Sequence, residues 1–420
     1  MPVPFRRHTF PNGLKLLVHE DFTTQLAACN VIYCVGSRDE DPQQTGLAHL
    51  MEHFMFCGSK NIPNYDAPLQ RVGGINNAYT SQDHTQYYVI LPAENLETAL
   101  WLESDRMMEL AFDPVGLDTQ KHVVIEEFKE TSLNRPFGDL WSGFCDFVYR
   151  KYPYKWMPIG KKISHIESVT MDIVRDFYRR YYTPDNAVLV VGGPVHFEEV
   201  VPMVEKWFGS IPAGEAVPHT YPREPQQRAG RVKTVSRNVP YPMLLKGWKM
   251  PHRLHPDFYA FDLLSDLLGN SKSSYLYREF IAKRQLFTDI SVTVTGTAGP
   301  GILALVARPA EGVDIHEANS QLEQFLYHDL QFGPQLSHNL QKVKNKNESS
   351  LLNNEIKLDG RTSILAVEES ISCAEDFEND LQKYQAVSEE QILRLMRETV
   401  IPQRDNTLFY LSTANQMHSR

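Results

Sequence analysis

The hydrophobic and polar positions follow the same order in two stretches of the chain. Residues 170–182 have the spacing of a capped amphipathic helix, and a Pro/Asp/Asn turn and an apolar run at 187–192 follow. Residues 388–398 predict a second capped amphipathic helix, again followed by a Pro/Asp/Asn turn at 402–406 and a β-rich run at 407–411. The repetition predicts an α+β protein of two similar halves, each a mostly antiparallel sheet covered by helices.

The division between the halves is expected near a proline-rich stretch. The segment from Gly209 to Arg231 contains four prolines and several polar residues, as linkers often do. We therefore expect an N-terminal half at 1–215, a linker at 216–231 and a C-terminal half at 232–420. A chain of 420 residues is long enough for two such domains. The Asn12-Gly13 pair predicts an N-terminal hairpin, which agrees with antiparallel strands.

One predicted helix carries titratable groups on an otherwise apolar segment. The stretch 46–58 is hydrophobic on most sides, so the helix should be buried, yet it contains His49, Glu52 and His53. Thr45 is expected to cap its start, and Gly58 to end it in a left-handed turn. Three titratable groups on a buried helix indicate a functional site.

The spacing of these groups is that of a metal site. His49 and His53 are four residues apart, so only about 40° around the helix axis separates them and both imidazoles can reach one ion. Glu52 lies close enough to contact water on the ion without being a ligand. The H-x-x-E-H order is the inverse of the H-E-x-x-H arrangement and suits the same metallohydrolase chemistry. The alternative is a pair of hydrogen-bonded core histidines.

A third ligand must come from elsewhere, because a catalytic zinc takes three protein ligands and keeps a fourth position open. The best candidate segment is 123–130, within a long helical run from about Pro114 to Leu133. Periodicity alone does not choose between Glu126, Glu127 and Glu130. Any of the three is equally explained as an exposed surface residue.

Three motifs in order carry a family resemblance. They are the H-x-x-E-H segment, Gly73-Gly74-Ile75-Asn76-Asn77-Ala78-Tyr79-Thr80, and Val123-Val124-Ile125-Glu126-Glu127. Together they resemble the pitrilysin family of zinc peptidases, the inverzincins, which include insulin-degrading enzyme and the mitochondrial processing peptidase. The chain is most similar to the short, single-unit bacterial members. The resemblance implies that Glu127, 74 residues after His53, is the third ligand of one zinc ion per chain.

The resemblance also implies a mechanism. Zinc held by His49, His53 and Glu127 would activate water, and Glu52 would act as general base and then as general acid. Many family members carry a second Glu seven residues before the third ligand, but this chain has Gln120 there. A Gln can hydrogen-bond a ligand but cannot balance charge, so this departure is expected to weaken metal binding without abolishing activity.

A substrate-binding strand is expected beside the metal helix. Residues 76–80 and 85–91 predict two strands around a polar turn. Asn77, Ala78 and Tyr79 resemble the family's exposed edge strand, where an extended peptide adds through backbone hydrogen bonds. The alternative is an ordinary Gly-Gly-Asn turn before a core strand.

The second half lacks the metal residues. The counterpart of the metal helix, 256–268, has no histidine pair, and Lys342, Lys344 and Asn345 occupy the region that corresponds to Glu127. We therefore expect a metal-free half that closes over substrate.

Family members usually carry an Arg and a Tyr seven residues apart in a metal-free half, where they bind substrate and stabilise the oxyanion. Ile281 and Thr288 stand at those positions here. Either a partner subunit supplies the pair, or Tyr275, Tyr277 or Arg278 substitutes for it; each of these three is also explained by packing or by the surface.

Composition excludes some classes of partner. The net charge is −10 and no basic cluster is present, so no nucleic-acid binding is expected. No run of 18 apolar residues predicts a membrane span, and the first eight residues lack the apolar core of a secretory signal. The five cysteines form no C-x-x-C pair. These features predict a cytoplasmic protein with reduced thiols.

Two functions remain as hypotheses. The first is a zinc endopeptidase that cleaves peptides or unfolded polypeptide segments inside a closed chamber. The second is a non-catalytic scaffold or peptide-binding subunit of a related complex, which the missing Arg/Tyr pair keeps open. Because one chain provides only half of the larger family members' chamber, we expect a homodimer, or a heterodimer with a sister subunit that carries the Arg/Tyr pair.

Overall fold

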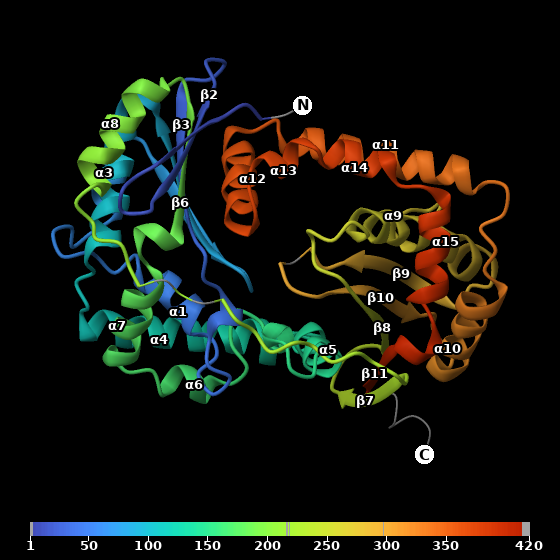
Figure 1. The fold of residues 1–420 in the computed structure, drawn as a ribbon. Coiled ribbons are helices and arrows are strands. Elements are labelled where there is room, and N and C mark those ends of the chain that lie inside the picture. Colours follow the sequence, from blue (N-terminus) through green and yellow to red (C-terminus); the bar gives the residue numbers. More distant parts are fainter. Residues whose placement is uncertain (1–2, 216, 218, 297, 414–420) are drawn as a thin grey trace. The chain divides into compact units, whose positions relative to one another are not determined.

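The structure, a computed structural model, describes residues 3–215, 217, 219–296 and 298–413. Residues 216 and 218 of the predicted linker lie outside this part of the chain, as do residues 1–2 of the N-terminal segment. The chain folds into two compact units, each built around its own sheet (Figure 1). The first unit comprises Met1–Glu130, Trp156–Tyr221 and Leu351–Asp380, and the second comprises Thr131–Lys155, Pro222–Ser350 and Leu381–Arg420.

The first unit contains a six-stranded sheet in the order β1-β2-β6-β3-β5-β4. Neighbouring strands are antiparallel except for the parallel pair β2 and β6. β4 has a partner on one side only, so it is an edge strand. The strands are β1 (Arg6–Thr9), β2 (Lys15–Glu20), β3 (Leu26–Tyr33), β4 (Ile75–Thr80), β5 (Thr85–Pro92) and β6 (Ala187–Gly193).

The second unit contains a five-stranded sheet in the order β7-β11-β8-β10-β9. Here the parallel pair is β11 and β7, and the other pairs are antiparallel. The strands are β7 (Arg231–Arg237), β8 (Met243–Met250), β9 (Phe287–Val294), β10 (Gly301–Pro309) and β11 (Asn406–Ser412).

The two sheets confirm the predicted internal repeat. Without β1, the first order reads β2-β6-β3-β5-β4, and each strand has a counterpart in the second order with the same direction. The two helices that revealed the repeat are both capped by a hydroxyl: Thr170 accepts from the backbone N–H of Ile173, and Ser388 from that of Gln391. The predicted N-terminal hairpin is also present, with β1 paired to β2.

Helices cover both faces of the first sheet (Figure 1). α3 and α8 pack on one face, and α12 packs across β3 and β6 on the other. The helices of this unit are α1 (Leu47–Phe54), α2 (Asp66–Arg71), α3 (Leu96–Met108), α4 (Pro114–Phe128), α6 (Ile163–Glu167), α7 (Met171–Tyr181), α8 (Phe197–Phe208), α12 (Leu358–Ile371) and α13 (Glu375–Glu378).

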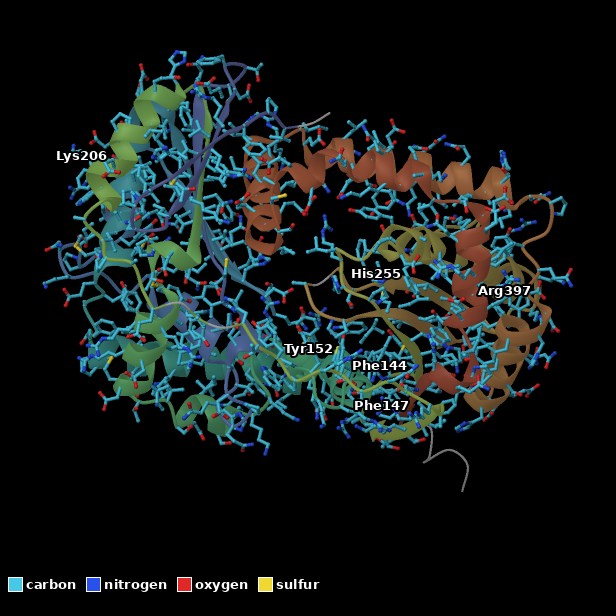
Figure 2. All side chains as sticks on the ribbon, viewed as in Figure 1. Phe144, Phe147, Tyr152, Lys206, His255 and Arg397 are labelled. Atoms are coloured by element: carbon cyan, nitrogen blue, oxygen red, sulfur yellow. The ribbon has the colours of Figure 1, made fainter. Side chains whose placement is uncertain are left out.

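In the second unit, α9 packs on β9 and β10, and α5 packs against β8 and β11. Phe144 of α5, labelled in Figure 2, belongs to the second unit. Its ring lies against Gly247 of β8, where a Cβ atom would come within 2.7 Å of it. This close approach explains a glycine inside a central strand. The helices here are α5 (Leu140–Val148), α9 (Phe258–Gly269), α10 (Ile315–Gln324), α11 (Leu336–Asn354), α14 (Asp380–Ala386) and α15 (Glu389–Glu398); α11 and α14 each extend across a unit boundary.

The compact units are discontinuous in sequence. Thr131–Lys155 belongs to the second unit, and Leu351–Asp380, which contains α12, belongs to the first. α12 is tied to the first sheet by Glu369, whose carboxylate pairs with Arg7 at 2.6 Å and with Lys15 at 3.1 Å. The simple ranges 1–215 and 232–420 therefore describe the order of the strands but not the packing of every segment. Among the described residues, no helix has the length and apolar character needed to cross a bilayer.

Candidate metal centre

Helix α1 presents two histidines on one face. Most of its residues are buried in the core of the first unit, whereas His49 and His53 are only partly buried. Their rings lie edge to face with centroids 4.8 Å apart. This is the arrangement that the four-residue spacing predicts.

The start of α1 differs from the prediction. Gly46, not Thr45, is the N-cap residue, with φ at +92°. Thr45 is turned away: its hydroxyl lies 2.9 Å from Nδ1 of His165 and accepts a hydrogen bond of 2.8 Å from the N–H of Lys161. Gly58 has φ at +107°, as predicted for the chain reversal after the helix.

Helix α4 brings a carboxylate to the histidines. Asp113 caps this helix by accepting from the N–H groups of Val115 and Gly116. Regular α-helix ends at Phe128, and Lys129–Asn134 is π-helical. The chain is therefore helical to Leu133 as predicted, but it changes from α-helix to π-helix after Phe128. Glu127 lies in the last turn of α4.

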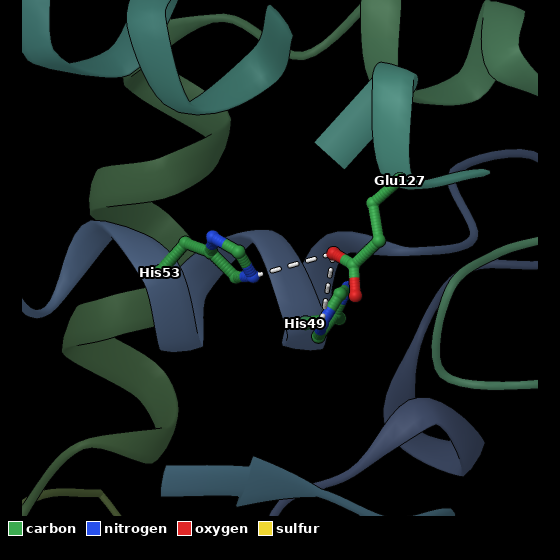
Figure 3. Close-up of side chains that lie close together, drawn as sticks. All are labelled: His49, His53 and Glu127. Atoms are coloured by element: carbon green, nitrogen blue, oxygen red, sulfur yellow. Dashed lines mark ion pairs between the residues drawn. The ribbon is translucent and has the colours of Figure 1, made fainter. Parts of the chain in front are cut away.

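Oε2 of Glu127 lies 3.8 Å from Nε2 of His49 and 3.6 Å from Nε2 of His53 (Figure 3). The three donor atoms lie within 4.8 Å of one another, and they form the one such group found among the described residues. In a tetrahedral zinc site with bonds of about 2.1 Å, donor atoms are about 3.4 Å apart. The residues therefore fit a zinc ion with little rearrangement.

The electrostatic setting also suits a metal. Burial, with a smaller effect of His53, lowers the pKa of His49 to about 4. The imidazole is therefore neutral at physiological pH, which is the form that binds metals. Nδ1 of His49 is buried and, among the described residues, forms no hydrogen bond.

Only one of the three candidate glutamates approaches the histidines. Glu126 is exposed and pairs instead with Lys129 at 2.6 Å on the helix surface. Glu130 is exposed as well. The geometry therefore supports Glu127, in agreement with the family resemblance.

Glu52 lies on the same helix but outside the donor cluster. Its carboxylate is mostly buried, and Oε2 accepts a hydrogen bond of 2.5 Å from the hydroxyl of Thr80. Burial raises the pKa of Glu52, while the hydrogen bond from Thr80 opposes the shift. The hydrogen bond from Thr80 thus orients the carboxylate, and its role in proton transfer stays a prediction.

Gln120 contacts a neighbour other than the three donors. Burial raises the pKa of the Cys57 thiol, and a hydrogen bond with the Gln120 side chain opposes that shift. Cys57 follows α1, and its sulfur lies 4.0 Å from the carbonyl oxygen of His53. Support of a metal ligand by Gln120 stays a prediction.

The edge strand β4 runs beside α1. Asn77 and Tyr79 are exposed, and Oδ1 of Asn77 accepts a hydrogen bond of 2.9 Å from the N–H of Ala78. Tyr79 hydrogen-bonds Gln86 on the neighbouring strand β5. Among the described strands β4 pairs with β5 alone, and the role of Asn77, Ala78 and Tyr79 in binding substrate stays a prediction.

The corresponding parts of the second unit have structural contacts. α9 is buried almost throughout and carries no histidine. Lys344 of α11 donates to the carbonyl groups of Gln385 and Val387 at 2.8 and 2.7 Å. Lys344 thus binds carbonyl groups at the C-terminal end of α14 and just beyond it, where a helix leaves its last carbonyls without partners of its own.

Tyr275, one of the three expected replacements for the Arg/Tyr pair, has contacts within the second unit, and so has Thr288, which stands at the position of the expected Tyr. The hydroxyl of Tyr275 donates to the carbonyl of Phe332 at 2.8 Å and accepts from the side-chain amide of Asn339. Thr288 lies on the edge strand β9, with its hydroxyl 3.4 Å from the carbonyl oxygen of Arg308. These contacts favour a packing role for Tyr275.

Two neighbours of α1 were not identified from the sequence. Thr80 belongs to a motif that was noted for its strand, but its hydrogen bond to Glu52 depends on the packing of α1 against β4. Glu40 binds the first turn of α1 from outside the motif. An acidic residue shortly before a helix with a glycine N-cap is the only sequence signal for it.

Family models match two regions of the chain. A model described as Insulinase (Peptidase family M16) matches residues 15–136, which include the donor cluster. A model described as Peptidase M16 inactive domain matches residues 168–335. The two matches follow one another along the chain.

Curated proteins and a solved structure are also similar. The chain is 34% identical over 284 residues to zinc protease PqqE of Helicobacter pylori, covering 66% of this chain and 64% of that protein. It is 29% identical over 227 residues to mitochondrial-processing peptidase subunit beta of Saccharomyces cerevisiae, covering 52% and 48%. These matches thus span less than two thirds of the relatives' length. The crystal structure of a protease from Helicobacter pylori superposes with a TM-score of 0.89 and 26% identity, covering 98% of this chain and all of that one.

Proposed function

Since the chain belongs to peptidase family M16, the insulinase family, we propose that it is a zinc-dependent endopeptidase with its metal on His49, His53 and Glu127. The observation that carries the proposal is the cluster of the three donor atoms within 4.8 Å. A relative named a zinc protease agrees with this choice of metal.

The site residues have separate roles in this proposal. When bound, zinc supplies Lewis-acid polarisation and lowers the pKa of coordinated water to about 7. Glu52 accepts a proton from the attacking water and delivers it to the leaving amine. Thr80 keeps the Glu52 carboxylate oriented through its hydrogen bond of 2.5 Å.

The substrates are proposed to be peptides or unfolded segments of polypeptide. The edge strand β4 lies beside α1 and has a neighbouring strand on one side only, so an extended peptide can add to its other side as a further strand. Because the main chain provides the hydrogen bonds, this mode of binding tolerates varied sequences.

The assembly is proposed to be a dimer that closes a chamber. A zinc helix and an edge strand open to water would weaken electrostatic stabilisation and favour aggregation. The relative from Saccharomyces cerevisiae is named a subunit, which supports a heterodimer beside the homodimer. Cytoplasmic location stays a prediction.

A non-catalytic, peptide-binding subunit is the second candidate. Ile281 and Thr288 stand where relatives are expected to carry Arg and Tyr, and residues 168–335 match a model described as an inactive domain. Loss of an oxyanion donor lowers rates on the order of 100- to 1000-fold. Such a subunit would bind peptide along the edge strand β4 but would not cleave it.

Cleavage of an unstructured peptide library by the purified protein separates the two candidates. We expect cleavage that a chelator abolishes, and we expect Glu52→Gln to lower it on the order of 100- to 10,000-fold with zinc retained. Glu126→Gln, the same change on the exposed face of α4, is the matched control and should be fully active. Full activity of Glu52→Gln would contradict the mechanism, and peptide binding without cleavage by the wild type would favour the second candidate.

A further inference from the structure

The first turn of α1 cannot be capped by its own N-cap residue. The first backbone N–H groups of a helix have no partner within the helix. Gly46 has no side chain to offer them, and the hydroxyl of Thr45 lies near His165. A Cβ atom on Gly46 would also come within 2.5 Å of Ile166. The φ of +92° at this position strains any residue with a side chain, so glycine is favoured at residue 46 and the cap must come from elsewhere.

Glu40 provides that cap with both of its carboxylate oxygens. Oε2 accepts from the N–H of Gly46 at 3.0 Å, and Oε1 accepts from the N–H of Ala48 at 2.8 Å. The Glu40 side chain is buried, with 6% of the residue exposed. A buried carboxylate at a helix N-terminus is favoured both by these hydrogen bonds and by the helix dipole.

Trp156 fixes the orientation of the Glu40 carboxylate. Its indole Nε1–H lies 3.0 Å from Oε2 of Glu40 and 2.8 Å from the carbonyl oxygen of Ser37, and both oxygens accept from it. The indole is itself buried. Burial raises the pKa of Glu40, and the three N–H donors from Ala48, Gly46 and Trp156, which together occupy both oxygens, favour the ionised carboxylate and oppose that shift.

We propose that Glu40 is a positioning residue for the metal centre and that Trp156 holds it in place. The inference rests on the proposed metal site. His49 is the third residue of α1 and directly follows Ala48, whose N–H is bound by Glu40. Without the cap the first turn frays, which displaces His49. Glu52 and His53 lie later in the helix and keep their positions.

Replacement of Glu40 should therefore weaken metal binding through His49. In Glu40→Gln one oxygen is replaced by an amide group that faces an N–H donor, so one capping hydrogen bond is lost. We expect the affinity for Zn²⁺, measured by competition with a chelator, to fall about 10- to 100-fold. Trp156→Phe, which removes the indole donor and keeps an aromatic ring, should lower the affinity in the same direction by a smaller factor.

Glu369→Gln is the matched control for a merely structural effect. Glu369 is a buried carboxylate of the same unit that pairs with Arg7 and Lys15 and accepts from the N–H of Ala374. We expect this variant to lower the thermal midpoint of the metal-free protein and to leave the Zn²⁺ affinity unchanged. The Co²⁺-substituted protein gives a second readout, because its visible absorption reports ligand geometry.

The outcomes separate this inference from the proposed function. A changed Co²⁺ spectrum with weaker Zn²⁺ binding in Glu40→Gln, but not in Glu369→Gln, would support the positioning role. Unchanged Zn²⁺ affinity in Glu40→Gln, or an equal loss in Glu369→Gln, would overturn it. If the wild type binds no Zn²⁺, the proposed function itself fails.

Discussion

The hydroxyl of Thr80 donates a hydrogen bond of 2.5 Å to the carboxylate of Glu52, and this contact joins edge strand β4 to helix α1. The strand proposed to bind peptide thus touches the residue proposed to move the proton. Binding and proton transfer would share one rigid connection.

Removal of this hydroxyl should slow the reaction without affecting metal binding. Thr80→Val keeps the shape of the side chain and deletes the donor, so the Glu52 carboxylate loses its fixed orientation. We expect kcat to fall about tenfold, as for the partial loss of a hydrogen bond to a charged group, with KM and zinc content unchanged. Steady-state kinetics on an unstructured peptide measures this.

The matched control is Thr85→Val on the neighbouring strand. Thr85 lies opposite Thr80 in the register of β4 and β5, but its hydroxyl donates to the carbonyl of Val35 at 2.9 Å. This variant should keep the wild-type kcat. A Thr80→Val enzyme with unchanged kcat would show that Glu52 does not depend on the contact.

Three glutamates of the segment 126–130 should differ in their effect on the metal. Glu127→Gln should lower zinc occupancy strongly, because an amide oxygen is a poorer ligand than a carboxylate. Glu126→Gln and Glu130→Gln should leave it unchanged, since both side chains lie on the exposed surface. Metal analysis of the three purified variants measures this, and an equal loss in all three would exclude Glu127 as a specific ligand.

His84 should make the stability of the metal-free protein depend on pH. Burial lowers the pKa of His84 to about 4, an effect that Asp83 opposes and Arg38 assists. The unfolded chain, with an ordinary histidine pKa of about 6.5, binds the proton more readily. Stability contributed by this group is therefore present above about pH 6.5 and is lost as pH falls toward 4.

The expected size of this effect is about 3 kcal/mol over the full window, since each pKa unit corresponds to about 1.4 kcal/mol. Urea unfolding at several pH values can measure it. His84→Gln should reduce the dependence between about pH 4 and 6.5, to which the buried His49 also contributes, whatever its effect on absolute stability. An unchanged slope in this variant would show that His84 is not the group responsible.

The oligomeric state of the purified protein should determine whether it has peptidase activity without a second kind of subunit. We expect a dimer in sedimentation equilibrium, with peptidase activity in the same fraction. An active monomer would refute the closed chamber. An inactive homodimer that becomes active with a sister chain bearing the Arg/Tyr pair would establish the heterodimer.

Local patterns were sufficient for much of the fold. The repeated order of amphipathic helix, turn and apolar run, with the turns at 183–186 and 402–406, predicted the repeat that both sheets confirm. The four-residue spacing of His49 and His53 predicted two rings on one face of a helix. These features depend on residues close in sequence, where period and turn chemistry determine the structure.

Long-range packing could not be read in the same way. The choice of Glu127 over Glu126 and Glu130 needed a family resemblance, because all three share similar surroundings in sequence. The glycine N-cap of α1 is stable because Glu40 and Trp156 meet there, 116 residues apart in the chain. The position of α12 on the first sheet likewise depends on a long-range contact, because its residue Glu369 pairs with Arg7, which is 362 residues away in the chain.

The most direct test of the central claim is anomalous X-ray scattering at the zinc absorption edge from crystals of the purified protein. The proposed site predicts one strong peak per chain, within about 2.2 Å of Nε2 of His49, Nε2 of His53 and Oε2 of Glu127. Crystals of His53→Ala should lose the peak. A zinc peak away from these three atoms, or none in crystals grown with zinc, would contradict the account.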